Sequence, residues 1–248
     1  LTFQGQTLED GATTINSYYE ANVSITNASN GHALHEFTWN WNGTNYTIFN
    51  DSLVLMYNFD NVSALGESNS LFVDMSGNGN NATPSGFDGN EIKAGKYGKS
   101  IDLPGNDEFV SLDSQLTIDE DYTISVWLAS DAAKLAFGDD DNMQNYFGFP
   151  DASTSRLVDS GGTQMNFNMP SLTLGEYAHF VLTKDSSSNW RLYINGVESS
   201  TGPINDVDPF YLDTIGNGLT GTTNSFEGDI DEFRVYNRQL TEEEVGIL

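Results

Sequence analysis

The chain has 248 residues and carries 36 acidic against 9 basic side chains, a formal net charge of −27. This balance excludes a general nucleic-acid or anionic-membrane partner, because phosphate groups are bound by clustered Lys and Arg. No apolar run approaches the roughly eighteen residues of a membrane-spanning helix, so no membrane insertion is predicted. Cysteine is absent, which excludes disulfides and cysteine nucleophiles.

The first fifty residues differ from the rest of the chain. Alternating patterns predict three strands there, at residues 17–26, 35–41 and 44–49. Asn42-Gly43 is a strong two-residue turn between the last two strands. Three strands cannot bury a core of their own, so we expect residues 1–50 to form an N-terminal β extension docked on a main domain, residues 51–248. The open edge of the first strand offers a route to self-assembly.

The main domain is predicted to consist of many short strands. The patterns cover residues 53–59, 71–73, 100–103, 108–112, 122–129, 133–138, 145–149, 155–159, 163–168, 176–184, 190–194 and 197–200. Turns every eight to twelve residues, rich in Asn and Gly, are typical of an all-β sandwich and not of alternating strands and helices.

The chain closes on its longest strand pattern, residues 226–238. Strict alternation would place Ile230, Glu232, Arg234 and Tyr236 on one face and Asp229, Asp231, Phe233 and Val235 on the other. Thr241, followed by three glutamates, predicts a short helix with a threonine N-cap.

Four motifs in order now suggest a family. They are Leu55-Met-Tyr-Asn-Phe-Asp60 with the Asp74–Asn81 loop, Thr123-Ile-Ser-Val-Trp-Leu128, Trp190-Arg-Leu-Tyr-Ile-Asn-Gly-Val197 and Gly228-x-Ile-Asp-Glu-x-Arg-x-Tyr236. Together they resemble a laminin-G-like (concanavalin A-like) domain over residues 51–248. The resemblance implies a jelly-roll sandwich of two antiparallel sheets. Residues 1–50 resemble an immunoglobulin-like segment that precedes such domains in archaeal surface proteins. This fold hosts lectins, adhesion modules and glycosidases, so it does not fix the function.

The glycosylation motif Asn-x-Ser/Thr indicates an extracellular setting. It occurs only in the first third of the chain, at Asn22, Asn27, Asn42, Asn45, Asn50, Asn61 and Asn81. We therefore expect an extracellular, glycosylated surface protein of archaeal or bacterial type.

A calcium site is predicted from oxygen-bearing side chains on loops. Ca²⁺ takes six to eight oxygen ligands from carboxylates, Asn side chains and backbone carbonyls. Asp60 closes a strand, and Asp74 and Asn78 lie on a glycine-rich loop. The resemblance implies that this loop lies against the closing strand, which adds Asp231. The alternative is that these residues only form turns.

The closing strand also contains an enzymatic motif. Glu227-Gly-Asp-Ile-Asp-Glu232 matches the Glu-x-Asp-x-x-Glu pattern of laminarinase-type glycoside hydrolases. Retaining hydrolysis needs two carboxyl groups about 5–5.5 Å apart. Alternation puts Glu227 and Asp229 on one face, and Glu232 joins them only through a β-bulge. In those enzymes the motif lies mid-chain, so we do not predict an enzyme.

The predicted function is non-catalytic recognition of a glycan or a surface protein, with Ca²⁺ ordering the binding loops. Tyr146, Phe147 and Phe149, beside an acidic loop, are the candidate ligand-contacting residues. Two alternatives remain: a structural module of a surface layer or filament, and a hydrolase that uses Glu227 and Glu232.

Overall fold

The computed structural model describes most of the chain from residue 51 onward and short parts before it. The described residues are 2–4, 22–24, 37–41, 44–49, 51–105, 108–132, 134–139, 144–216 and 225–248. Asn27, Asn42 and Asn50 lie outside the described residues, as do most of the first predicted strand and the Asn42-Gly43 turn.

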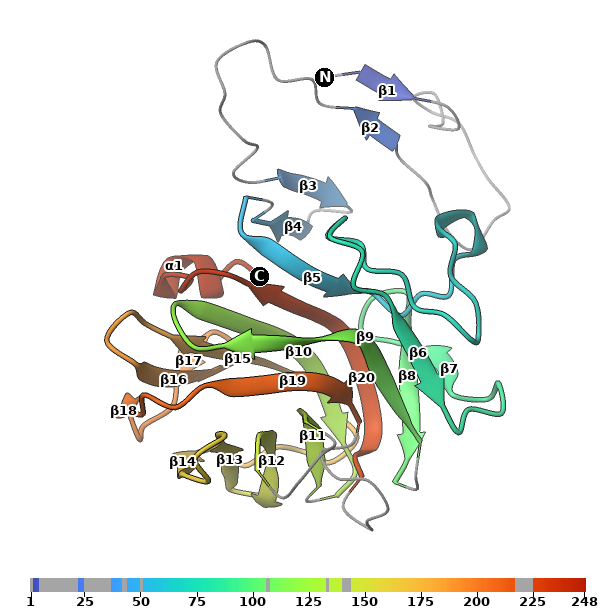
Figure 1. Cartoon of the computed structure of the whole chain (residues 1–248). Coiled ribbons are helices and arrows are strands. Elements are labelled where there is room, and N and C mark those ends of the chain that lie inside the picture. The colour runs from blue at the N-terminus through green and yellow to red at the C-terminus, as the bar shows by residue number, and fades with distance from the viewer. Residues whose placement is uncertain are drawn as a thin grey trace.

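Two large antiparallel sheets form most of the described part of the chain (Figure 1). The nine-stranded sheet has the order β17 (Val197–Glu198), β16 (Asn189–Ile194), β15 (Ala178–Lys184), β10 (Tyr122–Ser130), β20 (Glu227–Tyr236), β8 (Lys99–Pro104) and β7 (Ile92–Ala94), with β18 (Ile204–Asn205) beside β16 and β5 (Leu53–Tyr57) beside β20. The seven-stranded sheet has the order β14 (Gln164–Asn168), β13 (Thr154–Val158), β12 (Tyr146–Asp151), β11 (Leu135–Gly138), β19 (Phe210–Ile215), β9 (Phe109–Ile118) and β6 (Ala82–Ser85).

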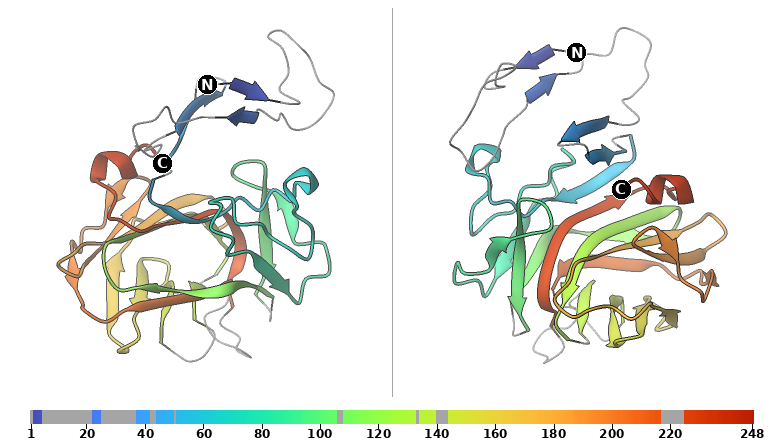
Figure 2. Two further views of the ribbon diagram at one scale, coloured as in Figure 1. Left: turned by 45° about the horizontal axis from the view of Figure 1, so that its top comes forward. Right: turned by 180° about the vertical axis from the view of Figure 1, so that it is seen from behind.

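The sheets pack face to face around one core, as the turned views in Figure 2 show. Alternate residues of each strand point inward, which is the pattern of a sandwich. Phe137 of β11 stacks on Phe147 of β12 with ring centroids 5.1 Å apart. It also meets Phe233 of β20, in the opposite sheet, edge to face at 5.3 Å. The predicted all-β, two-sheet fold is confirmed.

A smaller apolar cluster covers part of the nine-stranded sheet on the side away from the core. It contains Phe49, Leu53, Val181, Tyr193, Tyr236, Leu240 and Val245. The predicted short helix, α1 (Glu242–Val245), contributes Val245 and begins with a capping box between Thr241 and Glu244. None of the helices in the described parts of the chain is long and apolar enough to cross a membrane.

The N-terminal part contains two hairpin-like pairs. β1 (Thr2–Gln4) pairs with β2 (Asn22–Ser24), and β3 (Phe37–Trp41) pairs with β4 (Thr44–Ile48). The second pair was predicted, whereas β1 was not. Phe49, directly after β4, is buried in the apolar cluster next to α1. Docking of the whole segment 1–50 as one unit remains a prediction.

The closing strand β20 corrects the expectation of strict alternation. Its pairing with β10 shifts between Ser125, which faces Arg234, and Trp127, which faces Asp231. Glu232 accordingly has φ of 52°, which marks a β-bulge. The bulge leaves Ile230, Phe233 and Val235 in the core. Asp231 and Glu232 therefore both lie on the face that points away from the core. Strict alternation would place these two side chains on opposite faces.

Several strand boundaries also differ from the prediction. β19 and β6 lie in segments for which no strand was expected, and β9 is longer than the predicted 108–112. Leu71 and Phe72 form only isolated bridges in place of the predicted strand 71–73. A short element with one or two cross-strand hydrogen bonds cannot be separated from a strand by sequence pattern alone.

Candidate functional site

The exposed side of the seven-stranded sheet carries the best-formed candidate ligand site. We call it the outer face and define it by Gln115 of β9, Tyr146 of β12, Arg156 of β13, Asn166 of β14 and Tyr211 of β19. Each residue is directly followed in its strand by a residue that belongs to the core or packs against it, so all five point away from the core. Tyr146, Arg156 and Tyr211 are half-buried, while Gln115 and Asn166 are exposed.

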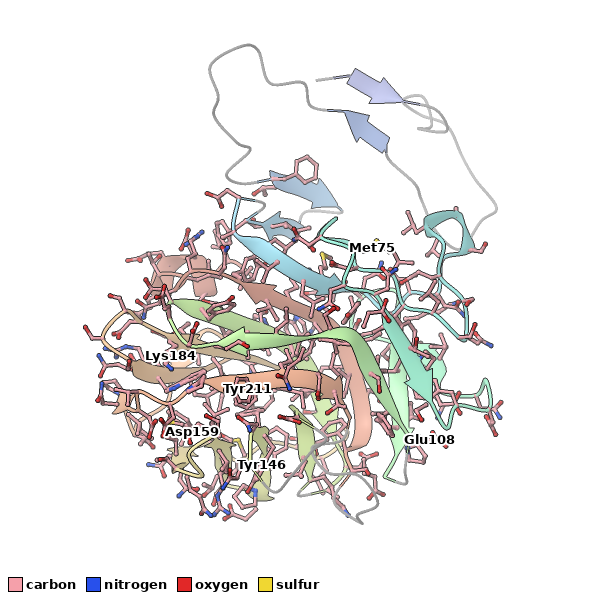
Figure 3. All side chains as sticks on the ribbon, in the orientation of Figure 1. Met75, Glu108, Tyr146, Asp159, Lys184 and Tyr211 are labelled. Atoms are coloured by element: carbon pink, nitrogen blue, oxygen red, sulfur yellow. The ribbon has the colours of Figure 1, made fainter. Side chains whose placement is uncertain are left out.

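The two tyrosines are held near each other by the end of the short strand β11. Beyond Gly138 this strand stops, and Asn145 bridges the gap between β12 and β19. The side-chain oxygen of Asn145 accepts a hydrogen bond from the backbone N–H of Tyr211 at 3.2 Å. Tyr146 follows Asn145 directly in the chain. Figure 3 shows Tyr146, Tyr211 and Asp159 on neighbouring elements of this side of the molecule.

Polar groups surround the tyrosines. Arg156 Nε donates to Asn166 Oδ1 at 2.8 Å, which fixes the guanidinium on the sheet surface. Gln115 Nε2 lies 3.4 Å from a carboxylate oxygen of Asp139 and 3.4 Å from one of Asp213. Two aromatic rings flanked by amide, guanidinium and carboxylate groups suit a ligand that has both apolar C–H faces and hydroxyl groups.

The other predicted ligand-contacting residues lie elsewhere. Phe147 is fully buried and packs on Phe137 and Phe180, so it has no surface to offer a ligand. Alternation explains this position, because Phe147 is one residue from the outward-pointing Tyr146. Phe149 also belongs to the core and lines a small apolar cavity of about 170 Å³ at the rim, together with Leu128, Met169, Leu172 and Phe180.

The four predicted calcium ligands separate into two pairs. Asp74 accepts hydrogen bonds from the backbone amides of Met56, Ser76 and Asn80. Asn78 donates to the carbonyls of Leu53 and Val54. This first pair therefore fastens its loop to β5, as turn-forming Asp and Asn residues commonly do.

The second pair, Asp60 and Asp231, meets at the loop 95–99. Asp60 Oδ1 accepts from the amide of Lys99 at 2.7 Å, and Asp231 Oδ2 accepts from the amide of Tyr97 at 2.9 Å. Asp231 is fully buried, and its Oδ1 atom has no hydrogen-bond partner among the described residues. Burial, with the nearby Glu232 and Asp60, raises the pKa of Asp231 to about 8.

The residues of the hydrolase motif are not arranged as an open carboxylate pair. The bulge brings Glu232 to the same side of β20 as Asp231, as the motif would require. However, Glu232 is only 9% exposed and forms an ion pair with Arg234. The amide of Tyr97, on the loop 95–99, bonds to the adjacent Asp231 and so lies against this part of the strand. A carboxylate that is buried and held in an ion pair is typical of a structural role and is not placed to react with a substrate.

The predicted glycosylation sites are spread over the N-terminal third. Asn22 lies in β2 and Asn45 in β4. Asn61 donates to Asn69 Oδ1 at 2.7 Å, and Asn81 Oδ1 accepts from the amide of Asp74 at 3.0 Å. Use of these sites as glycan acceptors remains a prediction.

Sequence reasoning missed Tyr211 and Arg156. Tyr211 lies between two core residues in Phe210-Tyr-Leu-Asp-Thr-Ile215, so the alternation was present in the sequence. Arg156 holds the matching position in β13, between Ser155 and Leu157. That both positions share one face follows only from the strand order, which pairs segments far apart in sequence.

Two antiparallel sheets packed around one core, with an exposed face that bears aromatic side chains, define a jelly-roll β-sandwich. The chain belongs to the concanavalin A-like lectin/glucanases superfamily, because the laminin-G-type family model Laminin_G_3 matches residues 104–246, more than half of the chain. This confirms the resemblance seen in the four motifs. A comparison with curated protein sequences finds no match.

Solved structures with the same fold include a domain of an enzyme, a toxin binding domain and a whole enzyme chain. Domain 4 of AbnA, a GH43 extracellular arabinanase from Geobacillus stearothermophilus, in complex with arabinotriose, is 21% identical, with a TM-score of 0.58, over 79% of this chain and 97% of that one. The binding domain of botulinum neurotoxin serotype D is 18% identical, with a TM-score of 0.58, and Trypanosoma rangeli sialidase is 15% identical, with a TM-score of 0.56. Each match covers 80% of this chain, but 51% of the toxin domain and 32% of the sialidase. At these identities the matches show the fold alone.

Proposed function

We propose that this protein is a non-catalytic recognition module that binds a glycan on the outer face, in an extracellular setting. The observation that carries the proposal is the placement of Tyr146 and Tyr211, two half-buried tyrosines on one sheet face, beside Arg156. Sugar rings present apolar C–H faces that pack on aromatic rings, and their hydroxyl groups accept and donate hydrogen bonds to polar side chains. The strongly acidic chain places one of its few basic groups, Arg156, on this face.

The comparison supports a carbohydrate ligand. An arabinanase domain of the same fold, matched over nearly its whole length, has been solved with arabinotriose. The pairing of Glu232 with Arg234 argues against hydrolysis by the motif on β20. A surface protein as partner, in place of a glycan, would use the same exposed face.

The test is binding of the purified chain to a panel of polysaccharides by native affinity electrophoresis. The panel contains arabinan, a β-1,3-glucan and a sialylated glycoprotein, with bovine serum albumin as the reference protein. We expect at least one of these to slow the chain relative to the reference, with no release of reducing sugar. Unchanged mobility in every gel would contradict glycan binding and favour a purely structural module.

We further propose that Ca²⁺ binds at Asp60 and Asp231 and orders the loop 95–99. The buried Oδ1 atom of Asp231 has no donor, and the two carboxylates converge on the same loop, so the residues fit a hard cation. Backbone carbonyls of a loop are common further ligands of this ion. Asp74 and Asn78 have their own partners in the neighbouring turn and are not needed for this site.

This proposal predicts a pH-dependent stability. Without Ca²⁺, the folded protein holds a proton on Asp231 more tightly than the unfolded chain does, because the folded pKa is about 8 against the ordinary 3.8. The stabilisation is complete below the unfolded pKa of 3.8 and is lost progressively as the pH rises to the folded value of about 8. In EGTA we therefore expect Tm to fall as the pH rises from about 4 to about 8 and to level off above that, and we expect Ca²⁺ to reverse the fall.

The matched variants are Asp231→Asn and Glu120→Gln. Asn cannot lose a proton, so Asp231→Asn should flatten the pH profile in EGTA and reduce the gain from Ca²⁺. Glu120 is an exposed acid in the turn before β10 and its variant should behave like the wild type. A pH profile that is the same in all three proteins would contradict this role of Asp231.

A further inference from the structure

A small apolar pocket opens at the rim of the sandwich, where β10 and β15 of one sheet face β12 of the other. Its volume is about 170 Å³. Its floor consists of core side chains from both sheets: Leu128 of β10, Phe180 of β15 and Phe149 of β12. The rings of Phe149 and Phe180 meet there with centroids 5.2 Å apart. The pocket therefore leads from the surface to the hydrophobic core.

One wall of the pocket is the loop between β14 and β15. Three apolar side chains of this loop line it: Met169, Leu172 and Leu174. The loop is fastened near its two ends, because the amide of Met169 donates to the carbonyl of Ser153 at 2.7 Å and the amide of Gly175 donates to the carbonyl of Ser130 at 3.1 Å. Leu174 is nevertheless 63% exposed. An apolar pocket with a large exposed apolar side chain at its edge is typical of a site that a ligand covers.

The mouth of the pocket is negatively charged. Asp151 and Glu176 line it, and both are exposed. Asp131 lies next to Gly175, the residue before Glu176, since its Oδ1 atom is 3.3 Å from the position of a Cβ atom there. Among the described residues, none of these three carboxylates forms an ion pair. Hydrogen bonds from the amide and the hydroxyl of Ser153 hold the pKa of Asp151 below its ordinary value, so this group is an anion at neutral pH.

The volume and the lining of the pocket define the apolar part of a ligand. A cavity of about 150 Å³ lined by Leu, Ile and Phe stays dry and binds benzene. The present pocket has a similar size and lining, so it accommodates one six-membered ring and is too small for a drug-sized ligand or a stretch of polypeptide. The side chains of the floor offer no hydrogen-bond partner to the hydroxyl groups of a sugar, so the pocket does not suit a glycan.

We propose that this pocket binds a small organic cation, in which one apolar ring is joined to an ammonium group by a short linker. The ring packs on Phe149 and Phe180, and the ammonium group lies at the mouth beside Asp151 and Glu176. A charged group at the mouth stays in contact with water and does not incur the cost of burial. The pocket shares no residue with the outer face, so the proposal stands whether or not a glycan binds there.

The test is a titration of the full chain with phenethylammonium chloride, followed through the methyl signals of Met169, Leu172 and Leu174 in ¹H–¹³C NMR spectra. We expect saturable shifts with a Kd of about 1 mM, an affinity that suits so small a ligand. The neutral analogue 2-phenylethanol has the same ring without the charge and should bind about two- to fivefold more weakly, the range for an exposed ion pair. Ethylammonium, which has the charge without the ring, should give no saturable shift.

Two variants test the two parts of the pocket separately. Leu174→Ala removes apolar contact area and should weaken phenethylammonium and 2-phenylethanol alike, by about threefold or more. Asp151→Asn combined with Glu176→Gln should bind phenethylammonium as weakly as 2-phenylethanol and leave the affinity for 2-phenylethanol unchanged. The matched control is Asp119→Asn combined with Glu120→Gln, which removes two charges from the exposed turn before β10 and should keep the wild-type affinity for both compounds.

The outcomes separate this site from general attraction of cations to an acidic protein. All five substituted side chains are exposed, so the variants are expected to fold. Equal affinity of the wild type and the Asp151/Glu176 double variant for phenethylammonium would overturn the proposal. So would an equal loss in the Asp119/Glu120 control, or the absence of shifts at the three methyl-bearing residues. Binding to the polysaccharide panel should be the same in every one of these variants, which keeps this test independent of the outer face.

Discussion

Replacing Tyr211 with alanine is expected to weaken glycan binding by about tenfold or more, which corresponds to about 1.4 kcal/mol. The reason is that a half-buried aromatic ring on a rigid strand supplies contact area at little entropic cost, so such residues dominate binding energy in many interfaces. Tyr146→Ala should have an effect of the same size. Affinity electrophoresis or calorimetry with the best polysaccharide of the panel measures both.

The matched control for these variants is Tyr97→Ala. Tyr97 is also half-buried, but it lies on the loop between β7 and β8, where its ring meets Trp127 of the nine-stranded sheet with ring centroids 5.8 Å apart. Its loss should leave glycan affinity unchanged. If Tyr97→Ala abolishes binding while Tyr146→Ala and Tyr211→Ala do not, the ligand lies on the opposite sheet and the assignment of the outer face fails.

Phe137→Ala is expected to cost about 3–5 kcal/mol of unfolding free energy, the range for removal of a buried aromatic ring. Phe137 is 1% exposed and contacts rings of both sheets: Phe147 and Phe210 on its own side and Phe233 across the core. Protein interiors are close-packed, so truncation of this ring leaves a cavity among its neighbours. A loss of this size removes much of the stability of an ordinary domain.

Urea unfolding followed by intrinsic fluorescence measures the effect. Leu174→Ala is the control, because Leu174 is 63% exposed at the rim and its truncation should change the unfolding free energy by less than about 0.5 kcal/mol. Similar urea midpoints for the two variants would contradict the view that the ring contacts of Phe137 hold the two sheets together.

The fold could be predicted from the sequence because its signals are local and occur in order. The strand β10, the motif Trp190–Val197 with its turn at Asn195-Gly196, and the closing strand β20 each have their own pattern, and together they specify a known arrangement. The β-bulge at Glu232 could not be predicted, because nothing in the pattern of β20 shows where this strand carries one residue more than its partner β10. Its position decides which carboxylates share a face.

The candidate sites were harder to predict, because turn chemistry and metal chemistry use the same residues. Asp74 and Asp231 look alike in sequence, yet Asp74 is satisfied by three backbone amides and Asp231 is left with an unpaired oxygen. Phe147 is a predicted candidate ligand-contacting residue, whereas alternation with Tyr146 places it in the core.

The most direct measurement of the central claim is amide chemical-shift mapping of the ¹⁵N-labelled chain during titration with an oligosaccharide of the best-binding polysaccharide. The account predicts the largest shifts at Tyr146, Arg156 and Tyr211 and along β12, β13 and β19. Shifts confined to Trp127 and the loop 95–99, or to the rim cavity near Leu174, would contradict a glycan site on the outer face.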